Sequence, residues 1–209
     1  MRNHFKIFSF YIVGVLFLSF GISLMILADL GAGPWDAFYV GLSTSFGFTM
    51  GSWVFMVGCL LILLNGYLLR KIPDASAVIT IFLVGIFVDF WQLIVFSGFT
   101  PASTWMQVAF LSTGLGFAAA GISSYLQSQF ARNPIDQLMM AVHFRTGFSL
   151  RMSKTLLEIF VLVLAFIVGG PIGIGTIIIA LSLGPLIQIF YPRIEQLRLR
   201  WTAPAAQTS

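Results

Sequence analysis

The stretch GISLMILADLGAGPWDAF, residues 21–38, returns 100 positions later as GISSYLQSQFARNPIDQL, residues 121–138. Both copies share Gly-Ile-Ser at their start and Pro-x-Asp near their end, and the window from residue 10 to residue 48 contains ten identities without a gap. A fixed offset of this kind indicates an internal repeat, in which each copy is one structural unit. The alternative explanation is a biased composition, which would give fewer identities.

The composition of the chain indicates a membrane protein. Of the 209 residues, 58% are hydrophobic and 9% are charged, whereas soluble domains usually carry about 25% charged residues. So few charges cannot cover a water-facing surface, which excludes an ordinary cytosolic enzyme or a nucleic-acid-binding domain. The net charge is +4, but the basic residues stand in short gaps between apolar runs, as is typical of membrane orientation.

Six apolar runs approach the ~20 residues that a transmembrane helix needs. They cover residues 8–28, 50–69, 77–96, 105–126, 152–168 and 175–191. Two further runs, residues 34–46 and 134–144, would reach only about 20 and 16 Å as helices, which is too short for a hydrocarbon core of about 30 Å. We interpret them as half-helices that enter the membrane, with helices at the membrane surface as the alternative.

The basic residues favour six crossings over eight. With six crossings and a cytoplasmic N-terminus, all 11 lysines and arginines lie on the cytoplasmic side. If both short runs crossed, Arg70, Lys71 and Arg132 would move outside, against the rule that cytoplasmic loops carry the positive charge. We therefore predict that both termini are cytoplasmic and that the first run is an uncleaved span, because it is longer than the core of a signal peptide.

Each copy of the repeat then contains a span, a short helix and two more spans. Because three crossings are an odd number, the second copy enters the membrane from the opposite face. The predicted fold is an all-α polytopic membrane protein with six transmembrane helices, two half-helices and an inverted-topology repeat of two three-span units. The first repeat covers residues 1–100, the second covers residues 101–192, and a basic cytoplasmic tail covers residues 193–209. Transporters with such repeats place their sites where the copies meet.

The two short runs begin alike, with a residue suited to the N-cap, then a proline, then an aspartate two residues later. These starts are Gly33-Pro34-x-Asp36 and Asn133-Pro134-x-Asp136. Proline suits the first turn of a helix, and a carboxylate near the N-terminus meets the positive end of the helix dipole. If both runs enter the membrane, these residues line a substrate or ion pathway near its centre. If both lie at the surface, the aspartates only stabilise helix ends.

Four further polar residues are pathway candidates, because polar groups inside spans are costly and usually face a bundle interior. They are Asp89 in the third span, Gln188 at nearly the equivalent place in the sixth, Glu158 in the fifth, and Arg145 after the second short run. We interpret Asp89 as a candidate proton carrier. For Glu158 the simpler interpretation is an i,i+4 pair with Lys154. Arg145 marks the cytoplasmic side or neutralises Asp136.

The chain contains no sequence pattern typical of catalysis. It lacks H-E-x-x-H and G-x-S-x-G, and its single cysteine, Cys59, and its histidines, His4 and His143, have no metal-ligand spacing. We therefore predict no enzyme activity, no cofactor and no metal. The expected partners are the lipid bilayer and a small-molecule solute. Small residues between positions 114 and 121 predict close helix packing, either within one chain or between chains of a homo-oligomer.

Several of these motifs occur together in one family. The run Ala28-Asp29-Leu30-Gly31-Ala32-Gly33-Pro34-Trp35-Asp36 resembles the signature of the bacterial YczE/YyaS membrane proteins, which are related to the YitT group. The second half agrees at Pro134-x-Asp136, Arg145-x-Gly147, Glu158, Gly169-Gly170-x-x-Gly173-Ile174-Gly175-Thr176 and Gly184-Pro185, so the resemblance covers nearly all of residues 8–192. It implies a place in the bacterial cytoplasmic membrane and, by analogy with some relatives, export of small molecules.

Three functions are compatible with the sequence. The first is a secondary transporter or exporter of a small organic solute, with Asp36 and Asp136 in a site at the repeat interface. The second is a non-transporting accessory protein that supports a membrane-associated enzyme or pathway. The third is a passive channel, which would conduct without coupling to a proton gradient.

Overall fold

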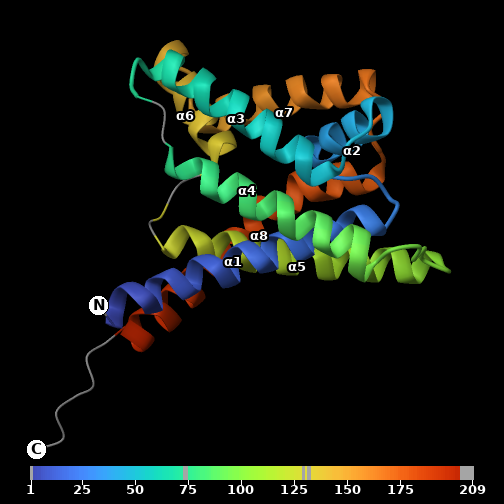
Figure 1. Ribbon diagram of the computed structural model, residues 1–209, viewed down its shortest axis with the longest axis horizontal. Helices are drawn as coiled ribbons and strands as arrows, with labels where there is room; N and C mark the ends of the chain where they lie inside the picture. Colours follow the sequence, from blue (N-terminus) through green and yellow to red (C-terminus); the bar gives the residue numbers. More distant parts are fainter. Residues whose placement is uncertain (1, 73–74, 129, 131–132, 203–209) are drawn as a thin grey trace, which may run out of the picture.

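The computed structural model describes residues 2–72, 75–128, 130 and 133–202, and within them it contains helices and no strands. The elements follow one another along the chain (Figure 1) as α1 Arg2–Leu27, α2 Pro34–Phe46, α3 Met50–Leu69, α4 Ser76–Asp89, the π-helix η1 Phe90–Val95, α5 Thr104–Gln127, α6 Pro134–Thr146, α7 Leu150–Ile167 and α8 Ile174–Thr202. The all-α prediction is therefore confirmed for the part of the chain that is described.

Short polar residues set the starts of several helices. Thr49, Ser103 and Ser149 precede α3, α5 and α7, and each hydroxyl accepts a hydrogen bond from the backbone N–H three residues later. Such N-caps satisfy a backbone donor that has no partner inside the helix. At the other end of α3, Arg70 adopts a left-handed conformation with φ 51°, which ends the helix.

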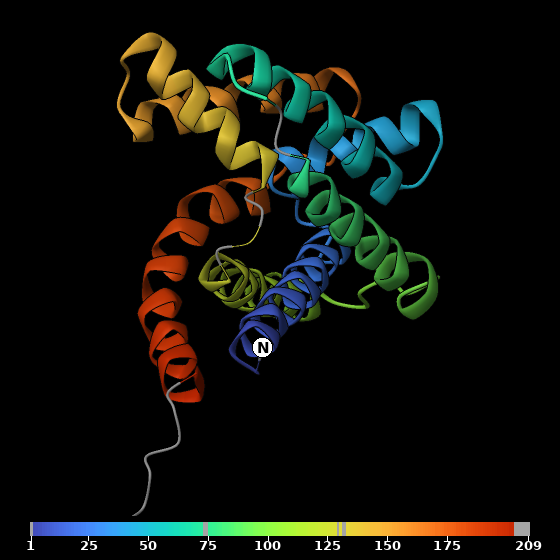
Figure 2. The same cartoon turned by 60° about the vertical axis from the view of Figure 1, so that its left-hand side comes forward.

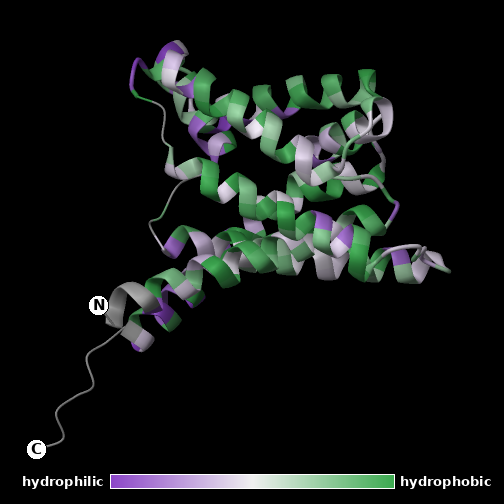
Figure 3. Ribbon diagram, viewed as in Figure 1, coloured by the Kyte–Doolittle hydropathy of each residue, from purple (hydrophilic) through white to green (hydrophobic). Residues whose placement is uncertain are grey.

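Five helices in the described part of the chain are long and apolar enough to cross a membrane. They are Lys6–Leu27, Met50–Leu69, Ser76–Val95, Thr104–Gln127 and Ile174–Trp201. The remaining predicted span corresponds to α7, which has 18 residues but carries Arg151, Lys154 and Glu158 in its first half. These charges lower its apolarity, so its crossing stays a prediction. Figure 3 shows that hydrophobic residues predominate along these helices. Many of their large apolar side chains are exposed, as expected for surfaces that contact lipid.

Two predicted spans differ in detail from the structure. The third consists of α4 followed directly by the π-helical η1, which begins after Asp89. The sixth does not end at residue 191, because α8 continues through Pro192 to Thr202. This extension packs on the start of α1, where the rings of Phe10 and Trp201 lie 5.6 Å apart. Residues 203–209 of the predicted tail, and Arg132, lie outside the described residues.

The most extensive helix contact in the fold joins the antiparallel helices α1 and α5, which cross each other in Figure 2. Gly14 faces Gly121, and Gly21 faces Gly114; a Cβ on Gly21 would lie 2.5 Å from the backbone nitrogen of Ala118. Backbones can approach this closely only where side chains are absent. In Figure 1, α1, α4 and α5 form the lower part of the molecule, and α3, α6 and α7 form the upper part. Across the two parts, α4 packs on both α1 and α3, and α8 packs on α5.

Candidate functional site

The two short helices begin as their spacing predicts. α2 starts at Pro34 after the N-cap Gly33, and α6 starts at Pro134 after the N-cap Asn133. The Asn133 side chain accepts a hydrogen bond from the backbone N–H of Ile135 at 3.0 Å, whereas Gly33 has no side chain to do so. Asp36 and Asp136 then stand in the first turn of each helix, where the helix dipole stabilises a carboxylate.

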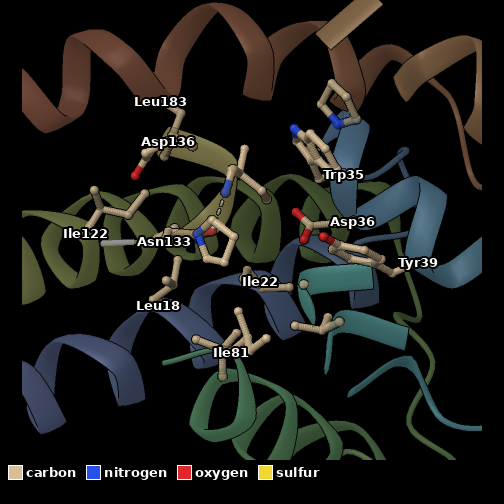
Figure 4. A pocket seen from close by; sticks show the side chains of 18 of the residues that line it. Leu18, Ile22, Trp35, Asp36, Tyr39, Ile81, Ile122, Asn133, Asp136 and Leu183 are labelled. Carbon is tan, nitrogen blue, oxygen red and sulfur yellow. Dashed lines mark hydrogen bonds between the residues drawn. The ribbon is translucent and has the colours of Figure 1, made fainter. Parts of the chain in front are cut away.

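Both helix starts line one cavity of about 240 Å³ inside the helix bundle. In Figure 4, Asp36 and Asp136 lie at opposite ends of this cavity, with Asn133 between them in the view. Its apolar walls come from α1, α3, α4, α5 and α8, through residues that include Leu18, Ile22, Val54, Ile81, Ile122 and Leu183. A mostly apolar cavity with a few polar groups is typical of a small-molecule site.

The two aspartates have different surroundings. The hydroxyl of Tyr125, on α5, donates a hydrogen bond to Oδ2 of Asp136 at 3.1 Å. Within the described residues the Asp36 carboxylate has no hydrogen bond or ion pair, although Tyr39 lies one turn further along α2 and lines the same cavity. Asp36 is partly buried, and a carboxylate withdrawn from water without a partner costs free energy, so Asp36 is the carboxylate in this cavity that a ligand would satisfy most.

One ion pair lies at an accessible side of the cavity. Lys154 Nζ and Glu158 Oε1, both on α7, are 3.6 Å apart, and their side chains are 49% and 27% exposed. Both residues line the cavity. Because Lys154 is also half exposed, the cavity connects with the surface along α7. Glu158 therefore has the local partner expected from its spacing and also belongs to the candidate site.

Two loops outside the cavity position α2. The Ala32 N–H donates to the Pro171 carbonyl at 2.9 Å, and the Gly175 N–H donates to the Leu30 carbonyl at 2.7 Å. These bonds join the loop before α2 to the loop before α8 and to the first turn of α8. Gly31, with φ +102°, permits the approach, because a Cβ there would lie 2.4 Å from the backbone nitrogen of Gly173. The start of α2 is thus fixed by backbone contacts across the chain.

A buried amide positions α6. Asn65, within the apolar α3, donates from Nδ2 to the Pro134 carbonyl at 2.8 Å, and its Oδ1 has no partner among the described residues. Sequence reasoning missed this residue. The available signal was a lone amide inside an apolar run, since polar groups in spans usually face a bundle interior.

Asn65→Leu is expected to destabilise the start of α6. The substitution keeps the number and branching of the side-chain heavy atoms but leaves the buried Pro134 carbonyl without its donor, at a cost of about 1–3 kcal/mol. Thermal unfolding of the detergent-purified protein measures this loss, with Leu63→Ala, at a 63%-exposed position of the same helix, as control. An unfolding midpoint that falls no further in Asn65→Leu than in the control contradicts this assignment.

Three sequence candidates do not line the cavity. Asp89 accepts hydrogen bonds from the Thr49 hydroxyl and from the Gly51 N–H, the latter at 2.8 Å, so it stabilises the start of α3. Gln188 is exposed on α8. Arg145 donates from Nε to the carbonyl of Leu68 at the end of α3. The candidates that do line the cavity are Gly33, Pro34, Asp36, Asn133, Pro134, Asp136 and Glu158.

Other cavity residues were not site candidates from the sequence. Among them are Trp35, Tyr39, Thr80 and Tyr125. Thr80 shares a hydrogen bond of 2.8 Å with the hydroxyl of Tyr11, which links α4 to α1. Each of these residues is common in membrane helices, so only the three-dimensional arrangement distinguishes them. In the part of the chain that the structure describes, no three His, Cys, Asp or Glu residues gather as metal ligands.

Comparison with known proteins gives a family and no activity. The family of unknown function DUF6198 matches residues 5–192. The uncharacterized protein YyaS of Bacillus subtilis is 38% identical over 189 residues, which cover 90% of this chain and 94% of the relative. The uncharacterized membrane protein YczE of the same organism is 33% identical over 192 residues, 90% of this chain and 87% of the relative.

A third relative comes from Haemophilus influenzae. This uncharacterized protein is 26% identical over 193 residues, which cover 92% of this chain and 87% of the relative. No solved structure matches the chain. The relatives bear out the expected resemblance, and with the apolar helices they identify a membrane protein.

Proposed function

Since the chain belongs to the DUF6198 family of unknown function, we propose its activity from the cavity: it is a secondary transporter that exports a small organic solute across the bacterial cytoplasmic membrane. The observation that carries the proposal is the shared cavity, into which two helix starts from different halves of the chain each bring an aspartate. The apolar walls suit the body of an organic solute, and the carboxylates suit a polar group or a proton.

The proposal includes an inverted repeat, and the helix contacts support it. At the offset of 100 residues, Gly14 is equivalent to Gly114 and Gly21 is equivalent to Gly121. Gly14 faces Gly121 and Gly21 faces Gly114, so exchanging the two repeats leaves this pair of contacts unchanged. The rings of Phe17 and its equivalent Phe117 lie 5.2 Å apart. In the same way, α2 packs on α7 and α3 packs on α6. A two-fold relation between residues 1–100 and 101–192 accounts for all of these pairs.

The proposed topology has six spans and both termini in the cytoplasm. The start of α1 lies beside the end of α8 (Figure 1), where Lys6 Nζ donates to the Trp201 carbonyl. Termini at one end of the bundle require an even number of crossings, and α7 crossing together with the five more apolar helices gives six. The positive charges assign this end to the cytoplasm. In this topology α2 and α6 are half-helices whose starts meet inside the membrane.

Transport would follow from movement of one repeat against the other around the cavity. In this conformation the bonds between the loops before α2 and α8 hold one side together, while the cavity reaches the surface beside Lys154. Asp89 remains a candidate proton carrier outside the cavity. If it carries the proton, Asp89→Asn removes the dependence of transport on a proton gradient.

Cysteine accessibility tests whether the cavity is an aqueous pathway. In a Cys59→Ala background, Trp35→Cys and Ile135→Cys introduce thiols at repeat-equivalent positions that both line the cavity. A charged thiol reagent is added from each side of membrane vesicles. We expect both positions to react, with access that is restricted or switches between sides. Leu63→Cys, on the exposed apolar face of α3, is expected to face lipid and remain unreactive.

Other labelling patterns would favour the other functions. If Trp35→Cys reacts freely from outside and Ile135→Cys freely from the cytoplasm, the short helices lie at the two surfaces. The central site would then be lost, and an accessory role with a stable partner in pull-down would be favoured. Free reaction of both thiols from both sides at once would instead indicate a passive channel.

A further inference from the structure

A second pocket lies where α3 and α6 end, apart from the central cavity. The residues that line it are Gly66, Tyr67, Arg70, Lys71, Ile72 and Arg145, so half of them are cationic. Figure 3 shows hydrophilic residues gathered at these helix ends, at the left of the view. Arg145 comes from α6 and donates to the Leu68 carbonyl of α3. The three positive charges thus converge from two helices that are held together.

The end of α3 does not need the side chains of Arg70 and Lys71 as caps. The Lys71 N–H donates to the Gly66 carbonyl at 3.1 Å, and the Arg70 N–H donates to the Tyr67 carbonyl at 3.3 Å. Backbone bonds of this kind satisfy the last carbonyls of a helix. Within the described residues, the side chains of Arg70 and Lys71 make no hydrogen bond or ion pair. Asp74 follows in the sequence but lies outside the described residues.

An exposed apolar strip leads along α3 to this pocket. Leu60, Leu63, Leu64 and Tyr67 are 63%, 63%, 40% and 78% exposed. Their spacing of three, four and seven residues puts them on one face of the helix. Since α3 is long and apolar enough to cross a membrane, this strip contacts lipid chains, and the pocket at its end lies at the depth of the lipid headgroups.

We propose that this pocket binds the headgroup of an acidic phospholipid, with an acyl chain along the Leu60–Tyr67 strip. A phosphodiester accepts hydrogen bonds from guanidinium and ammonium groups together. Basic pockets between transmembrane helices on the cytoplasmic side are known places for acidic headgroups. If these three cationic residues served only to orient the protein in the membrane, they would attract an anionic membrane surface but would form no saturable binding site. The inference uses the proposed topology and does not depend on transport.

Lipid binding to the purified full-length protein tests the proposal. In a neutral detergent, phosphatidylglycerol, phosphatidylcholine and inorganic phosphate are titrated separately, and bound lipid is counted by native mass spectrometry. We expect saturable binding of phosphatidylglycerol, with weaker binding of phosphatidylcholine and of phosphate. Arg70→Gln/Lys71→Gln should weaken phosphatidylglycerol binding at least about tenfold, since each basic residue near an anionic lipid contributes. Arg193→Gln/Arg200→Gln removes two exposed charges from α8 and should leave binding unchanged.

Several outcomes would overturn the inference. Equal affinity for phosphatidylcholine would remove the role of charge, and equal affinity for inorganic phosphate would indicate an anion site without lipid recognition. Equal weakening in the α8 control would indicate a general effect of net charge. Unfolding midpoints measured without lipid check that both double variants are folded. If the pocket variant does not fold, Lys71→Gln alone must still weaken binding about fivefold, because a single charge is then lost.

Discussion

Asp36→Asn is expected to reduce solute export at least tenfold while the protein still inserts and folds. Asn keeps the shape of the side chain, so the cavity and α2 should be unchanged, but the charge is lost. Charge-assisted hydrogen bonds contribute about 1.5–3 kcal/mol each. Because the Asp36 carboxylate has no hydrogen-bond or ion-pair partner among the described residues, it is available to bind the solute, and this contribution is lost in the variant. The solute can be found by comparing metabolites in the medium of cells with and without the protein, and its export is then measured in membrane vesicles.

Asp29→Asn is the matched control for this experiment. Asp29 is exposed, lies outside the cavity and has φ 54°, a left-handed conformation that asparagine tolerates well. The same chemical change at this position should leave export unchanged. Asp136→Asn should also reduce export, since Asp136 lines the cavity and is held by Tyr125. Normal export in both Asp36→Asn and Asp136→Asn would show that neither carboxylate is needed, and the transporter proposal would fail.

Local spacing made half of the site predictable. A proline in the first turn, a suitable N-cap before it and a carboxylate after it are requirements of the helix start itself, so both short helices could be placed from the sequence. The offset of 100 residues then made the two starts equivalent. Because equivalence in an inverted repeat implies a common centre, the sequence predicted that Asp36 and Asp136 share one site, and they do line one cavity.

Contacts between distant segments were not predictable in the same way. Asn65 holds the start of α6 from 69 positions away, and its role depends on where α6 lies. Asp89 looked like an intramembrane charge, but its partners, Thr49 and Gly51, stand 40 and 38 positions earlier in the chain, at the start of α3. The extension of α8 depends likewise on packing against α1. The apolar pattern of a single helix contains no information about such partners.

Gly121→Val is expected to be the most destabilising single change in the α1–α5 pair. A Cβ on Gly121 would lie 2.3 Å from the backbone nitrogen of Leu18 and 2.7 Å from the carbonyl oxygen of Gly14. These are backbone atoms, which cannot move aside as a flexible side chain can. The helices must therefore separate, at a cost of about 3 kcal/mol, and they must do so at the contact that joins the two proposed repeats. Thermal unfolding in detergent measures the loss.

Gly116→Val separates this packing effect from the general cost of valine in a helix. Gly116 lies on the same helix, and a Cβ there would have nothing within 4 Å. The control should therefore lose almost no stability, because valine even has a higher helix propensity than glycine. A similar unfolding midpoint for the two variants would contradict the close approach of α1 and α5. If Gly121→Val lowers the unfolding midpoint and Gly116→Val does not, Gly21→Val should lower it as well. The reason is that a two-fold relation makes Gly21 and Gly121 equivalent positions of one interface.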